Sequence, residues 1–284
     1  MVARRAHNPK VGGSNPPPAT KSHKTTTFNP HFKLQDIDIF KKISIIRPKE
    51  SWEITSLQFL NKKAIHFDLD GTLIDSVPDL ALAVNDMLEQ LGLTPVKEDL
   101  IRGWVGNGSQ MLVKRALARK RDITEDDVKA ETFQRAHKLF LDAYNSHLSE
   151  ATTPYQGVIE TLTTLKQRGY RLSIITNKPK VFVAPLLESL GFGDLIEAYL
   201  GGDSLQEKKP HPLPLEHMCQ TMGVGIEESV MVGDSKNDIL AANACGMESV
   251  GVSYGYNYGE SIQSYNPTCV IDRFDALLEL FAPL

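Results

Sequence analysis

Short apolar runs alternate along this chain with longer segments in which apolar residues recur at helical spacing. The runs lie at residues 64–69, 172–176, 230–233, 249–252 and 268–271, and each is expected to form a buried strand. Residues 158–168 and 181–190 flank the second run and have the helical pattern, with Gly169 and Gly191 as C-terminal stops. Strands that alternate with helices predict a parallel sheet covered on both faces.

The first two predicted strands are separated by about a hundred residues, more than one crossover helix requires, so a further element is inserted there. This insertion has two helical segments, namely a stripe of Leu80, Val84, Leu88 and Leu91 that ends at Gly92, and residues 126–148. We therefore predict an α/β fold, a doubly wound, Rossmann-like parallel sheet with an inserted helical cap domain. The expected bounds are 58–77 and 152–284 for the core and 78–151 for the cap.

Two carboxylates, Asp68 and Asp70, lie one residue apart where the first predicted strand runs into a Gly-Thr turn. A hard divalent cation such as Mg²⁺ would compensate their charge, leaving one oxygen free to attack phosphorus while the other carboxyl group handles protons. A lone Asp-Gly pair after a strand is more simply a turn. Further polar positions along the chain favour the chemical interpretation.

These further positions follow the later strands. A hydroxyl and an amide suited to phosphoryl oxygens, Thr176 and Asn177, end the second strand. A lysine precedes stiffening prolines in the run of residues 208–212, and two more acids, Asp234 and Asp238, follow the third strand. Ligands of open α/β sheets bind beyond the carboxyl ends of the strands, where Asp68, Thr176 and Asp234 all fall.

With these residues, the chain from about Lys62 onward resembles the haloacid dehalogenase superfamily of phosphatases. Within that superfamily it is most similar to the bacterial phosphoglycolate phosphatases. The matches to this subfamily are residues 68–79, which read DLDGTLIDSVPD, residues 105–108 in the predicted cap, the KKPHP run at 208–212, and residues 253–259.

The resemblance implies a role for each site residue. Asp68 would be the nucleophile that becomes an aspartyl-phosphate, and Asp70 would protonate the leaving alkoxide and then activate water. Thr176 and Lys209 would hold the phosphoryl oxygens. Mg²⁺ would be bound by Asp68, the backbone carbonyl of Asp70, and Asp234, with Asp238 orienting bound water or completing the shell.

Several assignments have alternatives. Lys209 is preferred to Lys208 because the family motif uses the residue just before the proline. Asp238 also suits the first turn of a helix, where acids are favoured.

The turn Gly106-Asn107-Gly108 is the cap's candidate substrate contact, since glycines let a backbone approach a ligand closely, although a plain helix-to-helix turn is the alternative. A substrate carboxylate would need a cationic partner, and the cap candidates are Arg102, Lys114 and Arg115, each of which could equally be surface charge.

The function predicted from these residues is Mg²⁺-dependent hydrolysis of a small phosphomonoester, with 2-phosphoglycolate as the expected substrate. Another capped member of the superfamily, such as a sugar-phosphate phosphatase, a pyrophosphatase or a phosphohexomutase, is the first alternative. A non-catalytic binding protein on the same fold is the second, and retention of both acids of the first motif argues against it.

Composition sets further limits on partners. The chain has 284 residues and a formal net charge of -4, which gives no reason to expect nucleic acid. No apolar run approaches the roughly 20 residues needed to cross a bilayer, so we expect no membrane contact and a cytoplasmic location. Three widely spaced cysteines suggest neither a disulfide framework nor a zinc site. We expect a monomer or a homodimer.

Residues 1–57 are expected to be a disordered extension, rich in polar residues and proline at its start. We further expect that residues 1–55 do not belong to the natural protein. Residues 12–18 read GGSNPPP, which the T arm of a transfer RNA gene can encode, and residues 19–21 can follow as its acceptor strand. The start would then be misassigned, and the true one would use a non-ATG codon, with the candidates Ile54, Leu57 and Leu60.

Overall fold

The computed structural model describes residues 59–124 and 127–284, so the predictions for residues 1–57 lie outside the described part of the chain. Within that part, six strands form one sheet in the order β5-β4-β1-β6-β7-β8. Each neighbouring pair in this sheet is parallel. The strands are β1 (Ala64–Phe67), β4 (Arg171–Ile175), β5 (Ala198–Leu200), β6 (Ser229–Gly233), β7 (Glu248–Val252) and β8 (Cys269–Ile271).

The predicted parallel sheet is therefore confirmed, with strand ends that differ by one or two residues from the sequence pattern. Strand β5 was not predicted. It has three residues, all half-buried, and lies at the edge of the sheet beside β4. Such a short edge strand carries too few apolar positions to show a periodicity.

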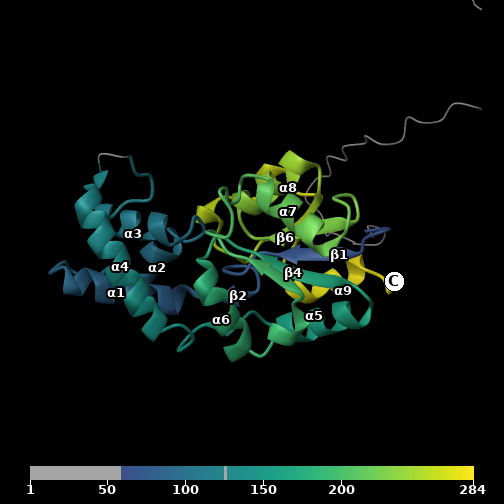
Figure 1. The fold of residues 1–284 in the computed structure, drawn as a ribbon, viewed down its shortest axis with the longest axis horizontal. Coiled ribbons are helices and arrows are strands. Elements are labelled where there is room, and N and C mark those ends of the chain that lie inside the picture. The colour runs from purple at the N-terminus through teal and green to yellow at the C-terminus, as the bar shows by residue number, and fades with distance from the viewer. Residues whose placement is uncertain (1–58, 125–126) are drawn as a thin grey trace, which may run out of the picture. The chain divides into compact units, whose positions relative to one another are not determined.

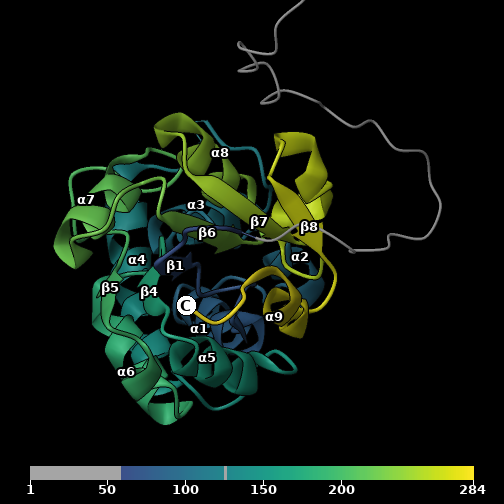
Figure 2. The ribbon, with the colours of Figure 1, turned by 90° about the vertical axis from the view of Figure 1, so that its right-hand side faces the viewer.

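Helices cover both faces of this sheet, as Figure 2 shows. One hydrophobic cluster joins the sheet to α5 (Val158–Gln167), α6 (Val183–Ser189) and α9 (Leu277–Leu280). A second cluster joins the opposite face to α7 (Leu213–Met222) and α8 (Lys236–Cys245). The central strand β1 is buried along its whole length, which explains its continuous apolar run.

The predicted cap is also confirmed, as a group of four helices that lie together in Figure 1. They are α1 (Val77–Gln90), α2 (Glu98–Arg102), α3 (Ser109–Ala118) and α4 (Ala130–Ser146), and they share a hydrophobic cluster that Phe182 and Tyr256 of the core also join. The segment predicted at 126–148 begins its helix only at Ala130, after Lys129 in an extended conformation. The exact cap bounds 78–151 stay a prediction.

Two short strands mark the connections between the sheet and these four helices. Strand β2 (Ile74–Asp75) pairs antiparallel with β3 (Thr153–Pro154), so the chain entering α1 lies beside the chain that returns after α4. The carboxylate of Asp79 accepts hydrogen bonds from the amides of Ala151 and Thr152, each at 2.8 Å. The two connections are thus tied together at the base of the cap.

The remaining elements are short 3₁₀ helices. They are η2 (Lys180–Phe182), η3 (Gly193–Leu195), η4 (Asn257–Gly259), η5 (Ile262–Tyr265) and η6 (Phe274–Ala276). Of the helices in the described ranges, none has the length and apolar character to cross a membrane.

Candidate active site

The predicted site residues meet at one edge of the sheet because their strands are neighbours. Strands β4 and β6 both pair with β1. Asp68 directly follows β1, Thr176 follows β4, and Asp234 follows β6. Parallel strands place these ends side by side, as the sequence predicted.

The turn after β1 brings Asp234 against the first motif. Gly71 has a φ of 93°, and a Cβ atom there would lie 2.4 Å from Asp234 Oδ2, so this position requires glycine. Thr72 Oγ1 donates to Asp234 Oδ1 at 2.9 Å, and the backbone amide of Tyr256 donates to Oδ2 at 2.7 Å. Asp234 is therefore held in one orientation by groups from two distant segments.

Three buried carboxylates crowd together here. Oxygens of Asp68, Asp234 and Asp238 all lie within 4.8 Å of one another. Burial, together with the neighbouring acids Asp238 and Asp70, raises the pKa of Asp68 to about 7 against the opposing charge of Lys209. Burial and the charges of Asp68 and Asp238 likewise raise the pKa of Asp234 well above its usual value. Such a cluster gains from a divalent cation with oxygen ligands, and Asp68 Oδ1 has no aligned hydrogen-bond donor among the described residues, so the donor set fits Mg²⁺.

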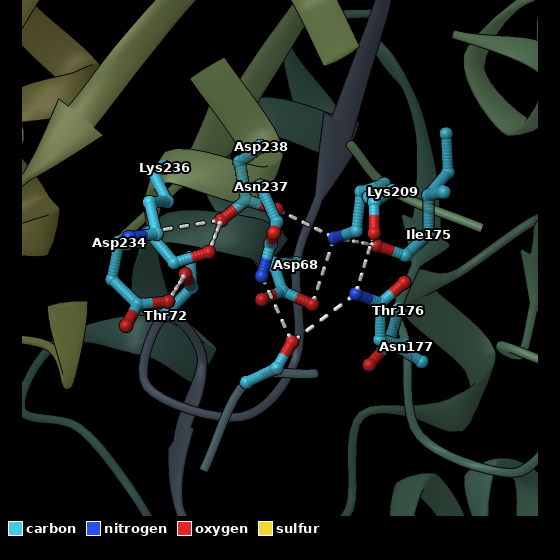
Figure 3. A network of polar contacts seen from close by, with 12 residues as sticks. Asp68, Thr72, Ile175, Thr176, Asn177, Lys209, Asp234, Lys236, Asn237 and Asp238 are labelled. Atoms are coloured by element: carbon cyan, nitrogen blue, oxygen red, sulfur yellow. Dashed lines mark hydrogen bonds and ion pairs between the residues drawn. The ribbon is translucent and has the colours of Figure 1, made fainter. Parts of the chain in front are cut away.

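Lys209 supplies a compensating charge inside this cluster, as Figure 3 shows. Its Nζ lies 3.0 Å from Asp68 Oδ1 as an ion pair and donates to Asp238 Oδ1 at 2.6 Å. It also donates to the carbonyl oxygen of Ile175 at the end of β4. Lys208, its neighbour, is exposed and donates instead to the carbonyl oxygen of Asn107 at 2.8 Å. The lysine preferred from the sequence is the one beside Asp68.

Asp238 lies in the first turn of α8, the alternative left open by the sequence. Its Oδ2 accepts from the backbone amide of Ser235 at 3.0 Å and from the Ser235 hydroxyl at 2.8 Å, which is part of a capping box. Because Oδ1 is taken by Lys209, both oxygens of Asp238 already have protein partners. Its predicted part in metal binding stays a prediction.

Asp70 is held by two side chains that the sequence did not single out. Ser76 Oγ donates to Asp70 Oδ1 at 2.5 Å. Lys178 Nζ donates to Oδ1 at 2.9 Å and to Oδ2 at 3.2 Å. Lys178 directly follows Thr176-Asn177, so its place in the same strand-end motif was the signal available in the sequence.

Thr176 and Asn177 both line the cavity beside Asp68. The hydroxyl oxygen of Thr176 accepts from the backbone amide of Lys178 at 3.1 Å. Asn177 Nδ2 donates to the carbonyl oxygens of Lys209, at 2.9 Å, and Gly106, at 3.1 Å. The amide of Asn177 therefore ties the core to the cap.

The cap turn of residues 106–108 reaches the same place. The carbonyl oxygen of Gly106 also accepts from Asn237 Nδ2 at 3.1 Å, and Asn107 Oδ1 accepts from the hydroxyl of Tyr258 at 2.6 Å. Gly106 and Gly108 line the cavity, whereas the polar groups of Asn107 bind core residues. The turn thus forms part of the cavity wall and also holds the cap against the core.

The three cap cations predicted as candidates for a substrate carboxylate do not line this cavity. Arg102 pairs with Asp75 at 3.0 Å. Arg115 is buried and donates to the carbonyl oxygen of Trp104 at 2.6 Å. Lys114 lies over the ring of Phe133, 5.0 Å from its centroid. Each therefore has a partner away from the cavity, and Arg115, being buried, is not the surface charge that was the alternative for it.

The cavity itself is small, about 40 Å³. Its charged and amide side chains come from the core, and most of its apolar side chains come from the cap. The lining residues are Asp68, Asp70, Thr176, Asn177, Lys178, Pro179 and Phe182 from the core side, and Leu80, Val105, Gly106, Gly108, Ser109, Leu112, Phe140 and Tyr144 from the cap side.

Comparison with known proteins gives concordant results. Residues 65–252 match the family model described as haloacid dehalogenase-like hydrolase. A protein of Psychrobacter arcticus named phosphoglycolate phosphatase is 48% identical over 220 residues, which cover 78% of this chain and 96% of that protein. One of Colwellia psychrerythraea with the same name is 46% identical over 222 residues, covering 78% and 98%. A crystal structure described as a predicted phosphoglycolate phosphatase from Haemophilus somnus superposes with a TM-score of 0.70 at 40% identity, covering 77% of this chain and 97% of that one.

Proposed function

Because this chain belongs to the haloacid dehalogenase-like hydrolases, we propose that it hydrolyses 2-phosphoglycolate to glycolate and phosphate with Mg²⁺. The observation that carries the proposal is the pair Asp68 and Asp70, which follow β1 and line the cavity, with Lys209 and Asp234 packed directly against Asp68. The names of the similar proteins supply the substrate.

In the proposed reaction, an oxygen of Asp68 attacks phosphorus and the bond from phosphorus to the ester oxygen breaks. Asp70 gives its proton to the departing alkoxide. In the second step Asp70 takes a proton from water, the resulting hydroxide attacks the aspartyl-phosphate, and phosphate leaves with the carboxylate of Asp68 restored.

The surrounding groups hold the phosphoryl oxygens and their charge. Lys209, fixed by Asp68, Asp238 and the carbonyl oxygen of Ile175, keeps a positive charge beside the nucleophile. The Thr176 hydroxyl lines the cavity and can donate to a phosphoryl oxygen. Such donors are most effective when they are already in place before charge develops.

Asp68, Asp234 and the backbone carbonyl of Asp70 are the groups proposed to hold Mg²⁺. When bound, the ion would neutralise the crowded carboxylates and the phosphoryl charge. The raised pKa values of Asp68 and Asp234 support this proposal, because burial and neighbouring acids disfavour their ionised forms and a bound cation would favour them. The predicted cytoplasmic location, the small-metabolite partner and the monomeric or homodimeric state stay predictions.

The proposal is tested by a substrate panel on the purified chain. We expect the highest kcat/KM for 2-phosphoglycolate, above a sugar phosphate and pyrophosphate, and no turnover after exhaustive chelation until Mg²⁺ is restored. Asp68→Asn is the matched control, since it changes one atom and removes the nucleophile. A sugar phosphate as the preferred substrate would contradict the substrate assignment, and full turnover by Asp68→Asn would contradict the mechanism.

A further inference from the structure

One cation lines the cavity beside the proposed nucleophile. Among the described lining residues, Lys178 is the one with a cationic side chain, and it is almost wholly buried. It comes from the loop after β4, whereas the facing wall comes from the cap helices. A buried ammonium group needs anionic or polar partners, so its hydrogen bonds show what else it can bind.

The two buried lysines differ in how many carboxylates surround them. Lys209 Nζ lies against two, Asp68 and Asp238. Lys178 Nζ lies against one, Asp70, and donates to both of its oxygens. Among the described residues, the charge of Lys178 is therefore shared by a single carboxylate, which leaves it able to attract a second one that enters the cavity.

A second donor faces the same space from the cap. The hydroxyl of Tyr144, on α4, is buried and has no hydrogen-bond partner within residues 59–124 and 127–284. Lys178 Nζ lies over the Tyr144 ring, 4.7 Å from its centroid, so the ammonium group and the Tyr144 side chain are neighbours in this cavity. Burial raises the pKa of Tyr144 to about 12, which keeps the hydroxyl protonated and able to donate.

The position of Asp70 fixes where a substrate carboxylate would lie. In 2-phosphoglycolate, one CH₂ group separates the ester oxygen from the carboxylate. In the proposed mechanism Asp70 protonates that ester oxygen, and Lys178 Nζ lies 2.9 Å from Asp70. A group two bonds beyond the ester oxygen therefore falls within reach of Lys178.

We propose that Lys178 Nζ and the Tyr144 hydroxyl bind the carboxylate of the substrate and so determine specificity for a phosphorylated hydroxy acid. This inference rests on the proposed function and names the residues that select its substrate. It replaces the cap cations Arg102, Lys114 and Arg115, which lie outside the cavity lining.

The test compares two substrates that differ in the carboxylate. The probes are 2-phosphoglycolate and ethyl phosphate, and the readout is the ratio of their kcat/KM values. We expect Lys178→Met to lower this ratio about 10- to 100-fold, the loss typical of a hydrogen bond to a charged group, chiefly through KM for 2-phosphoglycolate. Tyr144→Phe, which removes only the hydroxyl oxygen, should lower the ratio several-fold, and Lys178→Arg should restore part of it.

Lys166→Met is the matched control, because Lys166 is an exposed lysine on α5 and should leave the ratio unchanged. If Lys178 acted only by positioning Asp70, both substrates would lose equally in Lys178→Met, and this outcome would overturn the inference. A lower ratio of the two kcat/KM values in Lys114→Met but not in Lys178→Met would overturn it as well.

The same experiment separates this inference from the proposed function. A native enzyme that does not prefer 2-phosphoglycolate to ethyl phosphate would contradict both. If the native enzyme has that preference and Lys178→Met keeps the same ratio of kcat/KM values, the inference alone would be contradicted. Circular dichroism and Tm of each variant establish that the compared chains are folded.

Discussion

At the scale of single residues, the site separates its two reactive carboxyl groups by their partners. Asp68 is paired with Lys209 inside the acid cluster, whereas Asp70 turns to Ser76 and Lys178 at the cavity wall. Two carboxyl groups in different surroundings can take different roles, one as nucleophile and the other as proton donor.

Asp70→Asn tests the proton-donor role. An amide cannot protonate the leaving oxygen, so turnover should fall most for substrates with basic leaving groups. We expect a loss of about 10²- to 10⁴-fold in kcat for 2-phosphoglycolate, the usual contribution of general acid–base catalysis, and a clearly smaller one for p-nitrophenyl phosphate. Steady-state kinetics on both substrates gives the comparison. As a reference, Asp68→Asn should lose its activity on both substrates. Equal losses for the two substrates in Asp70→Asn would contradict the role.

At the scale of elements, a buried polar contact joins β1, β4 and α7. His66 Nδ1 lies 2.7 Å from Ser173 Oγ, and His66 Nε2 lies 3.6 Å from Cys219 Sγ. Burial lowers the pKa of His66 from its ordinary value of 6.5 to about 4. The sheet and α7 therefore pack around a neutral histidine.

This lowered pKa predicts a pH-dependent stability. Below pH 6.5 the unfolded chain takes up a proton on His66 that the folded chain does not bind until about pH 4, so His66 lowers the free energy of unfolding as pH falls through this range. The full effect is about 3 kcal/mol. Urea unfolding of the native chain and His66→Asn at pH 7.5 and 5 should show the native chain losing more stability than the variant.

His147→Asn is the control of opposite sign. His147 pairs with Asp86 at 2.8 Å and Glu150 at 3.1 Å, and these carboxylates raise its pKa. A raised folded pKa gives stability that is present below pH 6.5 and lost as pH rises. The native chain should therefore gain stability over His147→Asn as pH falls. The same pH dependence in His66→Asn as in the native chain would refute the assignment to His66.

At the scale of the whole molecule, residues 106–108 hold the cap to the core. Four core side chains contact this turn, namely Asn177, Lys208, Asn237 and Tyr258. Arg121, which follows α3, adds a contact from the cap side by donating to the carbonyl oxygen of Tyr258 at 3.0 Å. Opening of the cavity requires these contacts to break together.

Tyr258→Phe should make that opening easier. The change removes the hydrogen bond to Asn107 Oδ1, worth about 1 kcal/mol, so hydrogen exchange in a peptide covering residues 104–112 should rise about five-fold. Tyr265→Phe is the matched control, since Tyr265 donates to Glu260 outside this contact. Exchange that rises as much in the control, or not at all in Tyr258→Phe, would show that the turn does not hold the cap.

The sequence by itself determined the central strands, the cap insertion and the acids at the strand ends. These features are encoded within a few neighbouring residues, by apolar runs and by polar groups placed directly after them. Asp68, Asp70, Thr176 and Asp234 could be found this way because each directly follows a strand or its turn. The three-residue edge strand β5 escaped because its side chains are only half-buried.

Only the tertiary structure decided which side chains meet. Lys178 reaches Asp70 across 108 positions of sequence, and Asn237 reaches Gly106 across 131. No local pattern encodes such pairs, since they depend on how β4, α8 and the cap pack around β1. The same packing placed Lys209 in the acid cluster, directed Lys208 to the cap turn and left Arg102 paired with Asp75. Sequence therefore gave the chemical groups of the site, and long-range packing determined which of them bind one another, because side-chain partners are selected by distance in space rather than along the chain.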